Sequence, residues 1–302
     1  MTIVGSGAFR YERVLEWPQV PKHWDLGEPS DAAVNSTGEI YVLSRAARHP
    51  VTIWASDGRF ISSWGEGEFS AMPHGIYIGT DDNVWVVDRD YHIAVEFTPG
   101  GKTIRTLGRK LAPSPTCDGR VVKARPFNMP TNLAIGGNGD IFVADGYGGH
   151  KVHRFGADGT LQLSWGQQGQ GPGEFALVHN VWIDSRGRVF IADDENDRVQ
   201  IFDRDGTYLT EWKFSNPSGL CIHDDLVYVA ELQPFADPAR GPGSGSVCIL
   251  NLDGELQARW VGTDGSSHDT LIGPHDLCVD GRGDIYVCEP RGRRVSKFRK
   301  LA

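Results

Sequence analysis

The chain has 302 residues, of which 39% are hydrophobic, and it contains 38 glycines and 9 tryptophans. This length can bury a core without disulfides, and abundant glycine suits short strands joined by tight turns. The formal net charge is −9 with no basic stripe, which argues against a nucleic-acid partner. No stretch approaches the roughly 18 apolar residues of a membrane span. The segment from Met1 to Trp17 lacks the apolar run of a signal peptide, so we expect a cytoplasmic protein without a membrane partner.

An apolar run that ends at a polar corner residue recurs along the whole chain. Its copies are spaced by roughly 45 residues, which is typical of propeller blades. Most copies end in Asp or Glu, and they cover residues 40–43, 84–88, 141–145, 189–193, 227–231 and 285–289. Turns that contain Gly or Asp-Asp come before most of them, as expected for β-hairpins. Within these repeats lie four cysteines, Cys221, Cys248, Cys278 and Cys288, which we interpret as reduced core residues.

Each complete repeat continues with a third strand, an Asp-Gly or similar turn, and a fourth strand that ends in Trp. The last repeat stops after its third strand at Val295–Phe298, whereas Val14–Trp17 has the form of the fourth strand Leu209–Trp212. A strand from the N-terminus that completes the last blade would close the ring. The sequence therefore predicts an all-β fold, a single six-bladed β-propeller domain over residues 1–302, with the strand at 11–18 completing blade six.

Three histidines occupy the same place in the repeat, at the start of the first strand of blades two, four and six: His74, His179 and His275. Hydroxyl residues take this place in the other blades: Ser30, Thr131 and Ser218. The first strands of a propeller line its central channel, so alternate blades point three imidazoles at one spot. Three histidines around an open position are typical of catalytic zinc. A lone histidine here is more often a hydrogen-bonded channel residue, but the alternation favours a zinc site.

The loops that leave the second strands emerge on the same face as the histidines. They carry Arg45, Arg89, Tyr147 and Asp194. An arginine can bind a carboxylate through two hydrogen bonds, and a tyrosine beside a metal ion can act as a base. Taken alone, an arginine or a tyrosine at such a position is at least as often a surface or structural residue as a catalytic one. The repeated acids, by contrast, are expected to tie each corner together: Asp88, Asp145 and Asp193.

Two insertions interrupt the repeat, over residues 109–126 and 232–246. Both are expected on the histidine face, where they would either wall the site and set substrate choice or serve as tolerated surface loops. No glycine-rich turn lies between a strand and a helix, which excludes a nucleotide phosphate loop.

The residues of this face resemble a known family, the peptidyl-α-hydroxyglycine α-amidating lyases, over almost all of the chain. The blade-four stretch Gly171–Phe175 also resembles the NHL repeat. The likeness to the lyases lies in Leu43–Arg45, Met72–Gly75, Pro130–Thr131, Asp145–Tyr147, His179, Ala192–Asp193 and Pro274–Asp276. It implies zinc on the three histidines, Tyr147 as the catalytic base and Arg45 as the ligand of the substrate carboxylate. It also implies a structural calcium held by Asp276 and by the backbone carbonyls of Ala32 and Ile76.

The chemistry that this resemblance implies is cleavage of the N–C bond of a carbinolamide, which gives an amide and glyoxylate. We expect substrate contacts from Arg45, Arg89, Thr131 and Asp194. Asp194 stands where the family has an arginine, and the family's paired cysteines near the tyrosine are absent, with Gly148 after Tyr147. The substrate is therefore either peptide-like or a small molecule. Nothing in the sequence predicts an oligomeric state.

Two other functions remain open at this stage. A metal-dependent hydrolase or lactonase would use zinc on the same scaffold to activate water. A non-catalytic NHL binding module would carry the histidines without a metal, because a propeller fold alone does not decide function.

Overall fold

The computed structural model describes residues 2–115, 121–232, 245–261 and 271–302. These residues form 25 β-strands and one short 3-10 helix. They divide into two compact units, one of residues 67–214 and the other of residues 1–66 together with 215–302. No helix in these ranges is long and apolar enough to cross a membrane. Of the two insertions, residues 116–120 and 233–244 lie outside the described residues.

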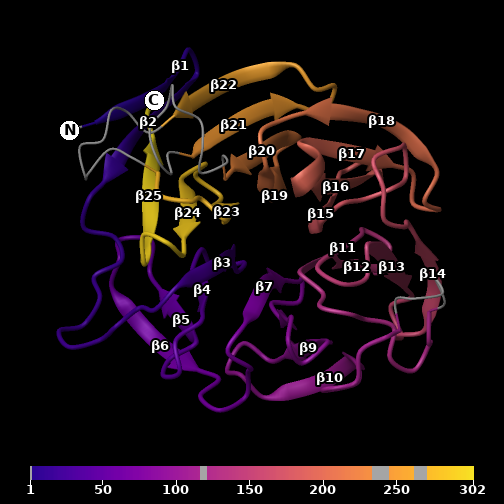
Figure 1. Cartoon of the computed structure of the whole chain (residues 1–302). Coiled ribbons are helices and arrows are strands. Elements are labelled where there is room, and N and C mark those ends of the chain that lie inside the picture. Colours follow the sequence, from indigo (N-terminus) through magenta and orange to yellow (C-terminus); the bar gives the residue numbers. More distant parts are fainter. Residues whose placement is uncertain (1, 116–120, 233–244, 262–270) are drawn as a thin grey trace. The chain divides into compact units, whose positions relative to one another are not determined.

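The unit of residues 67–214 consists of three four-stranded antiparallel sheets (Figure 1). The first contains β7 (Pro73–Ile78), β8 (Val84–Asp88), β9 (Ile93–Phe97) and β10 (Thr103–Gly108). The second contains β11 (Asn132–Ile135), β12 (Ile141–Asp145), β13 (Lys151–Phe155) and β14 (Leu161–Trp165). The third contains β15 (Val178–Ile183), β16 (Val189–Asp193), β17 (Arg198–Phe202) and β18 (Tyr208–Lys213), with the 3-10 helix η1 (Asp194–Asn196) after β16. The first strand of the middle sheet, β11, packs beside β7 and β15.

The other unit also has three sheets. One contains β3 (Pro29–Val34), β4 (Ile40–Ser44), β5 (Val51–Trp54) and β6 (Phe60–Trp64). The next contains β19 (Pro217–His223), β20 (Leu226–Glu231), β21 (Ser246–Asn251) and β22 (Leu256–Val261). The last has five strands in the order β1 (Ile3–Ser6), β2 (Phe9–Val14), β25 (Arg294–Lys300), β24 (Ile285–Glu289) and β23 (Asp276–Val279). Here β23 packs between β3 and β19.

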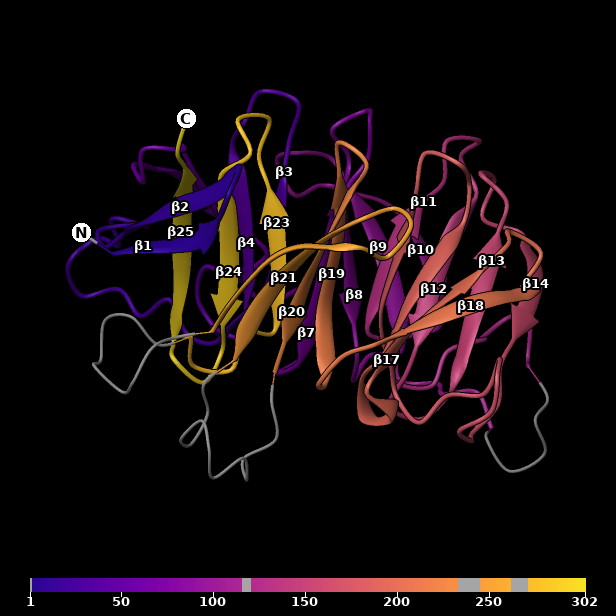
Figure 2. The ribbon, with the colours of Figure 1, turned by 90° about the horizontal axis from the view of Figure 1, so that it is seen from above.

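The N-terminal strand β2 lies beside the C-terminal strand β25 (Figure 2) and pairs with it antiparallel, Tyr11 opposite Lys300. It spans residues 9–14 where 11–18 was expected, and a short extra strand, β1, pairs with its outer edge. The strand ends early because Trp17 turns into the core, with its ring 4.7 Å from that of Tyr286. Pro18 has no N–H to continue the ladder.

The predicted all-β fold with six blades is confirmed by these six sheets. The second strands are almost wholly buried, in keeping with their apolar β-branched sequences. Each corner acid accepts hydrogen bonds from the segment that leads into its own blade. Asp88 binds the backbone N–H of Ser70, Asp145 that of Asn128 and Asp193 that of Ala176. The acids are therefore corner residues, as predicted.

The four cysteines of the repeats are free thiols in the core, as expected. Burial raises the pKa of the Cys221 and Cys288 thiols far above the usual range. The carboxylates of Asp276 and Asp31 raise it further. These thiols therefore stay protonated at neutral and mildly alkaline pH.

Thiol reactivity tests this burial. The fifth cysteine of the chain, Cys117, is replaced by serine so that only the four core thiols remain. In this Cys117→Ser variant we expect no reaction with Ellman's reagent over minutes at pH 8, because the thiolate is the reactive form. All four thiols should react once the protein is unfolded in guanidinium. Rapid reaction of any thiol in the folded protein would contradict the assigned burial.

Replacing a corner acid tests its role in stability. Asp193 accepts hydrogen bonds from Arg198, which is 4% exposed, and from the side chains of Asn196 and Gln200. Asp193→Ala leaves this buried guanidinium short of a partner, and we expect a loss of at least about 2 kcal/mol in the free energy of urea unfolding. The exposed turn residue Asp253 provides the control, since Asp253→Ala should stay within about 0.5 kcal/mol of wild type. Equal stability of the two variants would rule out the corner role.

Candidate metal centre and active-site rim

His74 is the second residue of β7 and is 2% exposed. Its Nδ1 lies 2.9 Å from the backbone carbonyl oxygen of Thr131, in the neighbouring blade. A carbonyl oxygen can only accept, so Nδ1 carries the proton and donates it. Nε2 is then the nitrogen with the lone pair, which is the form of histidine that binds a metal ion.

His275 repeats this arrangement in the other unit. It directly precedes β23, and its Nδ1 lies 2.7 Å from the carbonyl oxygen of Ser30 on β3. The same argument gives a donating Nδ1 and a lone pair on Nε2. Metal-binding histidines almost always make such an outer hydrogen bond, which fixes the ring orientation.

His179 is the second residue of β15 and lies close to His74. The ring centroids are 4.8 Å apart, and the ligand nitrogens lie within 4.8 Å of each other. Two nitrogens that each bind zinc at about 2.0–2.1 Å are at most about 4.2 Å apart, so this spacing is near that of ligands to one ion. The structure therefore brings together two of the predicted ligands within one unit.

The hydroxyl residues between the histidines have a structural role. The Thr131 hydroxyl donates to the carbonyl oxygen of Val178, the residue before His179, at 2.8 Å. Likewise the Ser218 hydroxyl donates to the carbonyl oxygen of Pro274, the residue before His275, at 2.9 Å. Within each unit, histidine and hydroxyl residues therefore alternate, and each side chain donates a hydrogen bond to a backbone carbonyl at the start of the next first strand.

This series corrects one expectation. Thr131 was expected to contact the substrate, but it has no exposed surface and both of its polar groups are occupied. Its carbonyl orients His74, and its hydroxyl holds the strand that carries His179. Thr131 therefore supports the histidines and does not reach a bound substrate.

Tyr147 lies beside the two histidines, as expected for a base at this site. Its hydroxyl donates to Nε2 of His74 at 3.3 Å, and its ring meets the His74 ring edge-on with centroids 5.5 Å apart. The loop that carries it consists otherwise of glycines. A Cβ on Gly146 would lie 2.0 Å from the carbonyl oxygen of Val178, and one on Gly149 would lie 2.0 Å from the Asp145 carboxylate. Only glycine allows this close approach, so the loop is packed tightly under Tyr147.

Arg89 contacts Tyr147. Its guanidinium carbon lies 5.0 Å from the centre of the Tyr147 ring, a cation–π contact, and its Nε pairs with Asp90 at 2.8 Å. The structure thus brings Arg89 to the rim near the histidines. Whether it also touches a substrate stays a prediction.

Arg45 lies at the corresponding corner of the other unit. It pairs with Glu28 through Nη1 at 3.3 Å, and its side chain is only 15% exposed. Its Nε is buried and meets no hydrogen-bond acceptor among the residues that the structure describes. A guanidinium with an unused inward donor is suited to an anion such as a carboxylate. Glu28 directly precedes β3 and Arg45 directly follows β4, so the antiparallel pairing of these strands sets the acid opposite the arginine.

The remaining predicted residues are placed as follows. Asp194 is buried at the start of η1, and its backbone N–H donates to the carbonyl oxygen of Leu177, next to the strand that carries His179. Asp276 and Ala32 are buried on the adjacent strands β23 and β3. Ile76 is buried on β7, in the other unit. The roles of these four residues stay predictions.

His153, which lies outside the register of the three predicted ligands, has a structural role. It is fully buried on β13, with Nε2 3.3 Å from the Asp145 carboxylate and Nδ1 2.7 Å from the Ser164 hydroxyl. In blade four the equivalent position of the third strand is Gln200, whose side-chain amide donates to the corner acid Asp193 at 3.1 Å. Alignment of the third strands would have revealed this role.

Comparison with known proteins agrees with the fold. A family model described as a 6-bladed beta-propeller matches residues 128–228. The solved structure of a gluconolactonase from Xanthomonas campestris has a TM-score of 0.64 at 14% identity, covering 92% of this chain and 88% of that one. The chain therefore shares the six-bladed propeller fold with proteins of little sequence similarity.

Two curated relatives are more similar in sequence. NHL repeat-containing protein 3 from Homo sapiens is 28% identical over 316 residues, covering 96% of this chain and 86% of that protein. Peptidyl-alpha-hydroxyglycine alpha-amidating lyase 1 from Drosophila melanogaster is 29% identical over 274 residues, covering 80% of this chain and 47% of the lyase. The chain thus spans about half the length of that lyase. It is distantly similar both to an NHL-repeat protein and to an amidating lyase.

Proposed function

We propose that this protein is a zinc-dependent carbon–nitrogen lyase that cleaves a carbinolamide into an amide and glyoxylate. The observation that carries the proposal is the group of His74, His179 and Tyr147, in which the tyrosine hydroxyl lies 3.3 Å from Nε2 of His74, the nitrogen that carries the lone pair. The distant similarity to an amidating lyase supports the same reaction.

The proposed zinc ligands are His74, His179 and His275. The donor set fits, because three neutral imidazoles that leave a fourth position open are typical of catalytic zinc. His74 and His275 make the same hydrogen bond through Nδ1, which prepares Nε2 of both for an ion. When bound, zinc supplies a positive charge that lowers the pKa of a coordinated hydroxyl group.

A structural calcium is a second part of the proposal. Asp276 would supply a carboxylate, and Ala32 and Ile76 would supply backbone carbonyls. Oxygen ligands of this kind suit Ca²⁺. The neighbouring strand accommodates Asp276 closely, since a Cβ on Gly219 would lie 2.9 Å from its Oδ1.

The chain's own residues account for the proposed reaction. Arg45, held by Glu28, binds the substrate carboxylate and the charge that develops on it. Tyr147, as the phenolate, takes the proton of the α-hydroxyl group and passes it to the nitrogen as the N–C bond breaks, which restores the phenolate. The hydroxyl carbon becomes the aldehyde of glyoxylate, the nitrogen leaves as the amide, and no water is consumed.

Arg89 and Asp194 are proposed to select the substrate. Arg89 provides a cation beside Tyr147, whereas Asp194 puts an acid next to the His179 strand. With the substrate carboxylate on Arg45, the acid at Asp194 favours a substrate whose hydrogen-bond donors lie toward it, and the cation at Arg89 favours hydrogen-bond acceptors. The substrate is then a small-molecule or peptide-like carbinolamide.

Metal content tests the histidine group. We expect about one zinc ion per chain in protein purified without chelators, and loss of most of it in His179→Ala, because two imidazoles bind zinc far more weakly than three. Elemental analysis by mass spectrometry measures both. His223→Ala, at the far end of β19, is the control and should keep its zinc. Native protein without metal would rule out both the lyase and a metal-dependent hydrolase.

Product analysis tests the reaction. α-Hydroxyhippurate should release glyoxylate, and Tyr147→Phe should lower kcat at least about 100-fold while it retains zinc, since the variant lacks the group that moves the proton. Tyr91→Phe is the matched control and should remain active. Glyoxylate release by fully active Tyr147→Phe would remove Tyr147 as the base. Hydrolysis of lactones or amides with no glyoxylate from α-hydroxyhippurate would favour the hydrolase.

A further inference from the structure

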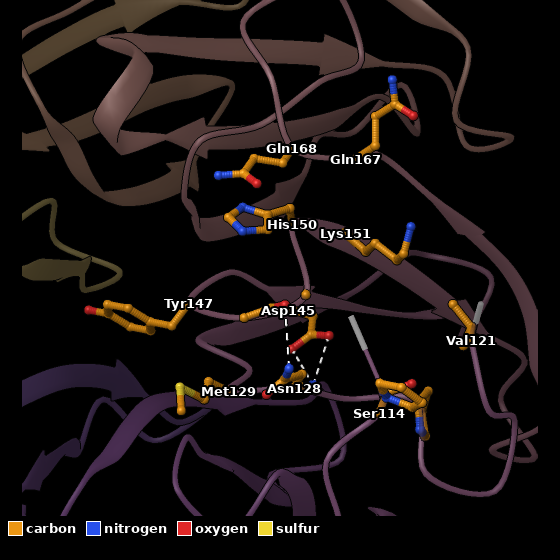
Figure 3. Close-up of a pocket in the computed structure, with 14 residues that line it drawn as sticks. Ser114, Val121, Asn128, Met129, Asp145, Tyr147, His150, Lys151, Gln167 and Gln168 are labelled. Atoms are coloured by element: carbon orange, nitrogen blue, oxygen red, sulfur yellow. Dashed lines mark hydrogen bonds between the residues drawn. The ribbon is translucent and has the colours of Figure 1, made fainter. Parts of the chain in front are cut away.

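A cavity of about 430 Å³ opens beside Tyr147, within the unit of residues 67–214 (Figure 3). Tyr147 and Met129 lie at one end, whereas Val121 and Ser114 lie at the other. The Tyr147 hydroxyl points out of this group of residues, and it bonds to His74 on that side. The Tyr147 ring therefore stands between the histidines and the cavity.

The walls of the cavity combine apolar and neutral polar groups. Pro115, Val121, Pro126 and Met129 contribute apolar surface, and Ser114, Asn128, Gln167 and Gln168 contribute hydroxyl and amide groups. Such a mixture is typical of pockets for small organic ligands. It favours a chain of apolar groups interrupted by amides.

The charged groups of the lining are already paired. The Asn128 backbone N–H is shared between the two oxygens of the Asp145 carboxylate, at 2.8 and 2.9 Å, and His153 donates a further hydrogen bond to this carboxylate. The Lys151 ammonium donates to the carbonyl oxygen of Gly166 at 2.8 Å. The cavity therefore does not demand a charged ligand.

The floor of the cavity is tied to the Tyr147 loop. The backbone N–H of Tyr147 donates to the carbonyl oxygen of Met129, and that of Gly148 donates to Asn128. A Cβ on Gly148 would lie 2.7 Å from the Asn128 side chain. A ligand held here is thus held at a fixed position relative to Tyr147.

We propose that this cavity is a subsite for the N-acyl arm of the carbinolamide, the part of the substrate on the far side of the nitrogen from the reacting carbon. The arm is a neutral, extended acyl chain with at least one further amide. The volume of about 430 Å³ lies within the range of roughly 300–1,000 Å³ typical of pockets for small organic ligands, enough for such a chain. This proposal rests on the proposed lyase function, since Tyr147 is taken as the reacting group.

The kinetic test compares two substrates that differ only in this arm, N-acetyl-α-hydroxyglycine and N-acetyl-valyl-α-hydroxyglycine. In the wild type the longer substrate should have a kcat/KM at least about tenfold higher, mostly through a lower KM. Val121→Trp fills the end of the cavity far from Tyr147 and should abolish this gain while turnover of the short substrate is unchanged. Ala124→Trp, an exposed residue of the same segment that does not line the cavity, should keep the gain.

A binding test separates this subsite from the reaction. N-acetylglycine and N-acetyl-valylglycine lack the α-hydroxyl group and cannot react, so calorimetric titration measures the arm alone. We expect tighter binding of the longer compound, lost in Val121→Trp and weakened in Gln168→Leu. Length-dependent binding without glyoxylate release would keep the subsite and reject the lyase. Glyoxylate release with no effect of arm length, or equal losses for both substrates in a folded Val121→Trp, would overturn the subsite.

Discussion

The hydrogen bond from a histidine Nδ1 to a backbone carbonyl of the next blade is the interaction on which the candidate site depends. It is made by His74 to Thr131 and by His275 to Ser30, at 2.9 and 2.7 Å. The bond fixes the tautomer and turns Nε2 away from the strand. Because donor and acceptor both lie at the start of first strands, the register of the sheets orients the imidazoles, and the surface loops do not.

The hydroxyl residues complete this arrangement. Thr131 and Ser218 each bond to the carbonyl that precedes the next histidine. A histidine in one blade and a small hydroxyl residue in the next therefore support each other, which gives a physical reason for their alternation. A larger residue at Thr131 would displace the strand that carries His179. The buried corner acids Asp88, Asp145 and Asp193 accept hydrogen bonds from the backbone that leads into their blades. These bonds help to fix the positions of the first strands.

Much of the fold could be predicted from the sequence because the repeat fixes strand order and face. The six repeated apolar runs correspond to buried second strands, and the N-terminal strand joins the last sheet. The end of that strand could not be predicted, since Trp17 resembles the strand-ending tryptophans of other blades but packs into the core against Tyr286. Strand patterns describe the repeat, whereas this departure depends on a single side-chain contact.

The candidate site could be predicted less completely. Repeat position alone placed Tyr147 near His74 and Arg89 at the same rim. Repeat position did not by itself give the side-chain pairs Arg45–Glu28 and His153–Asp145, because the repeat sets which strands pair while the residue types at these positions differ from blade to blade. The cavity beside Tyr147 was equally hidden, since its walls come from three separate loops.

X-ray absorption spectroscopy at the zinc edge tests the central claim most directly, because it reports the atoms bound to the ion. The account predicts three imidazole nitrogens and one further light atom at about 2.0–2.1 Å from zinc, with no sulfur. A spectrum with sulfur ligands, or with fewer than three imidazoles, would contradict the assignment of His74, His179 and His275 as the metal site.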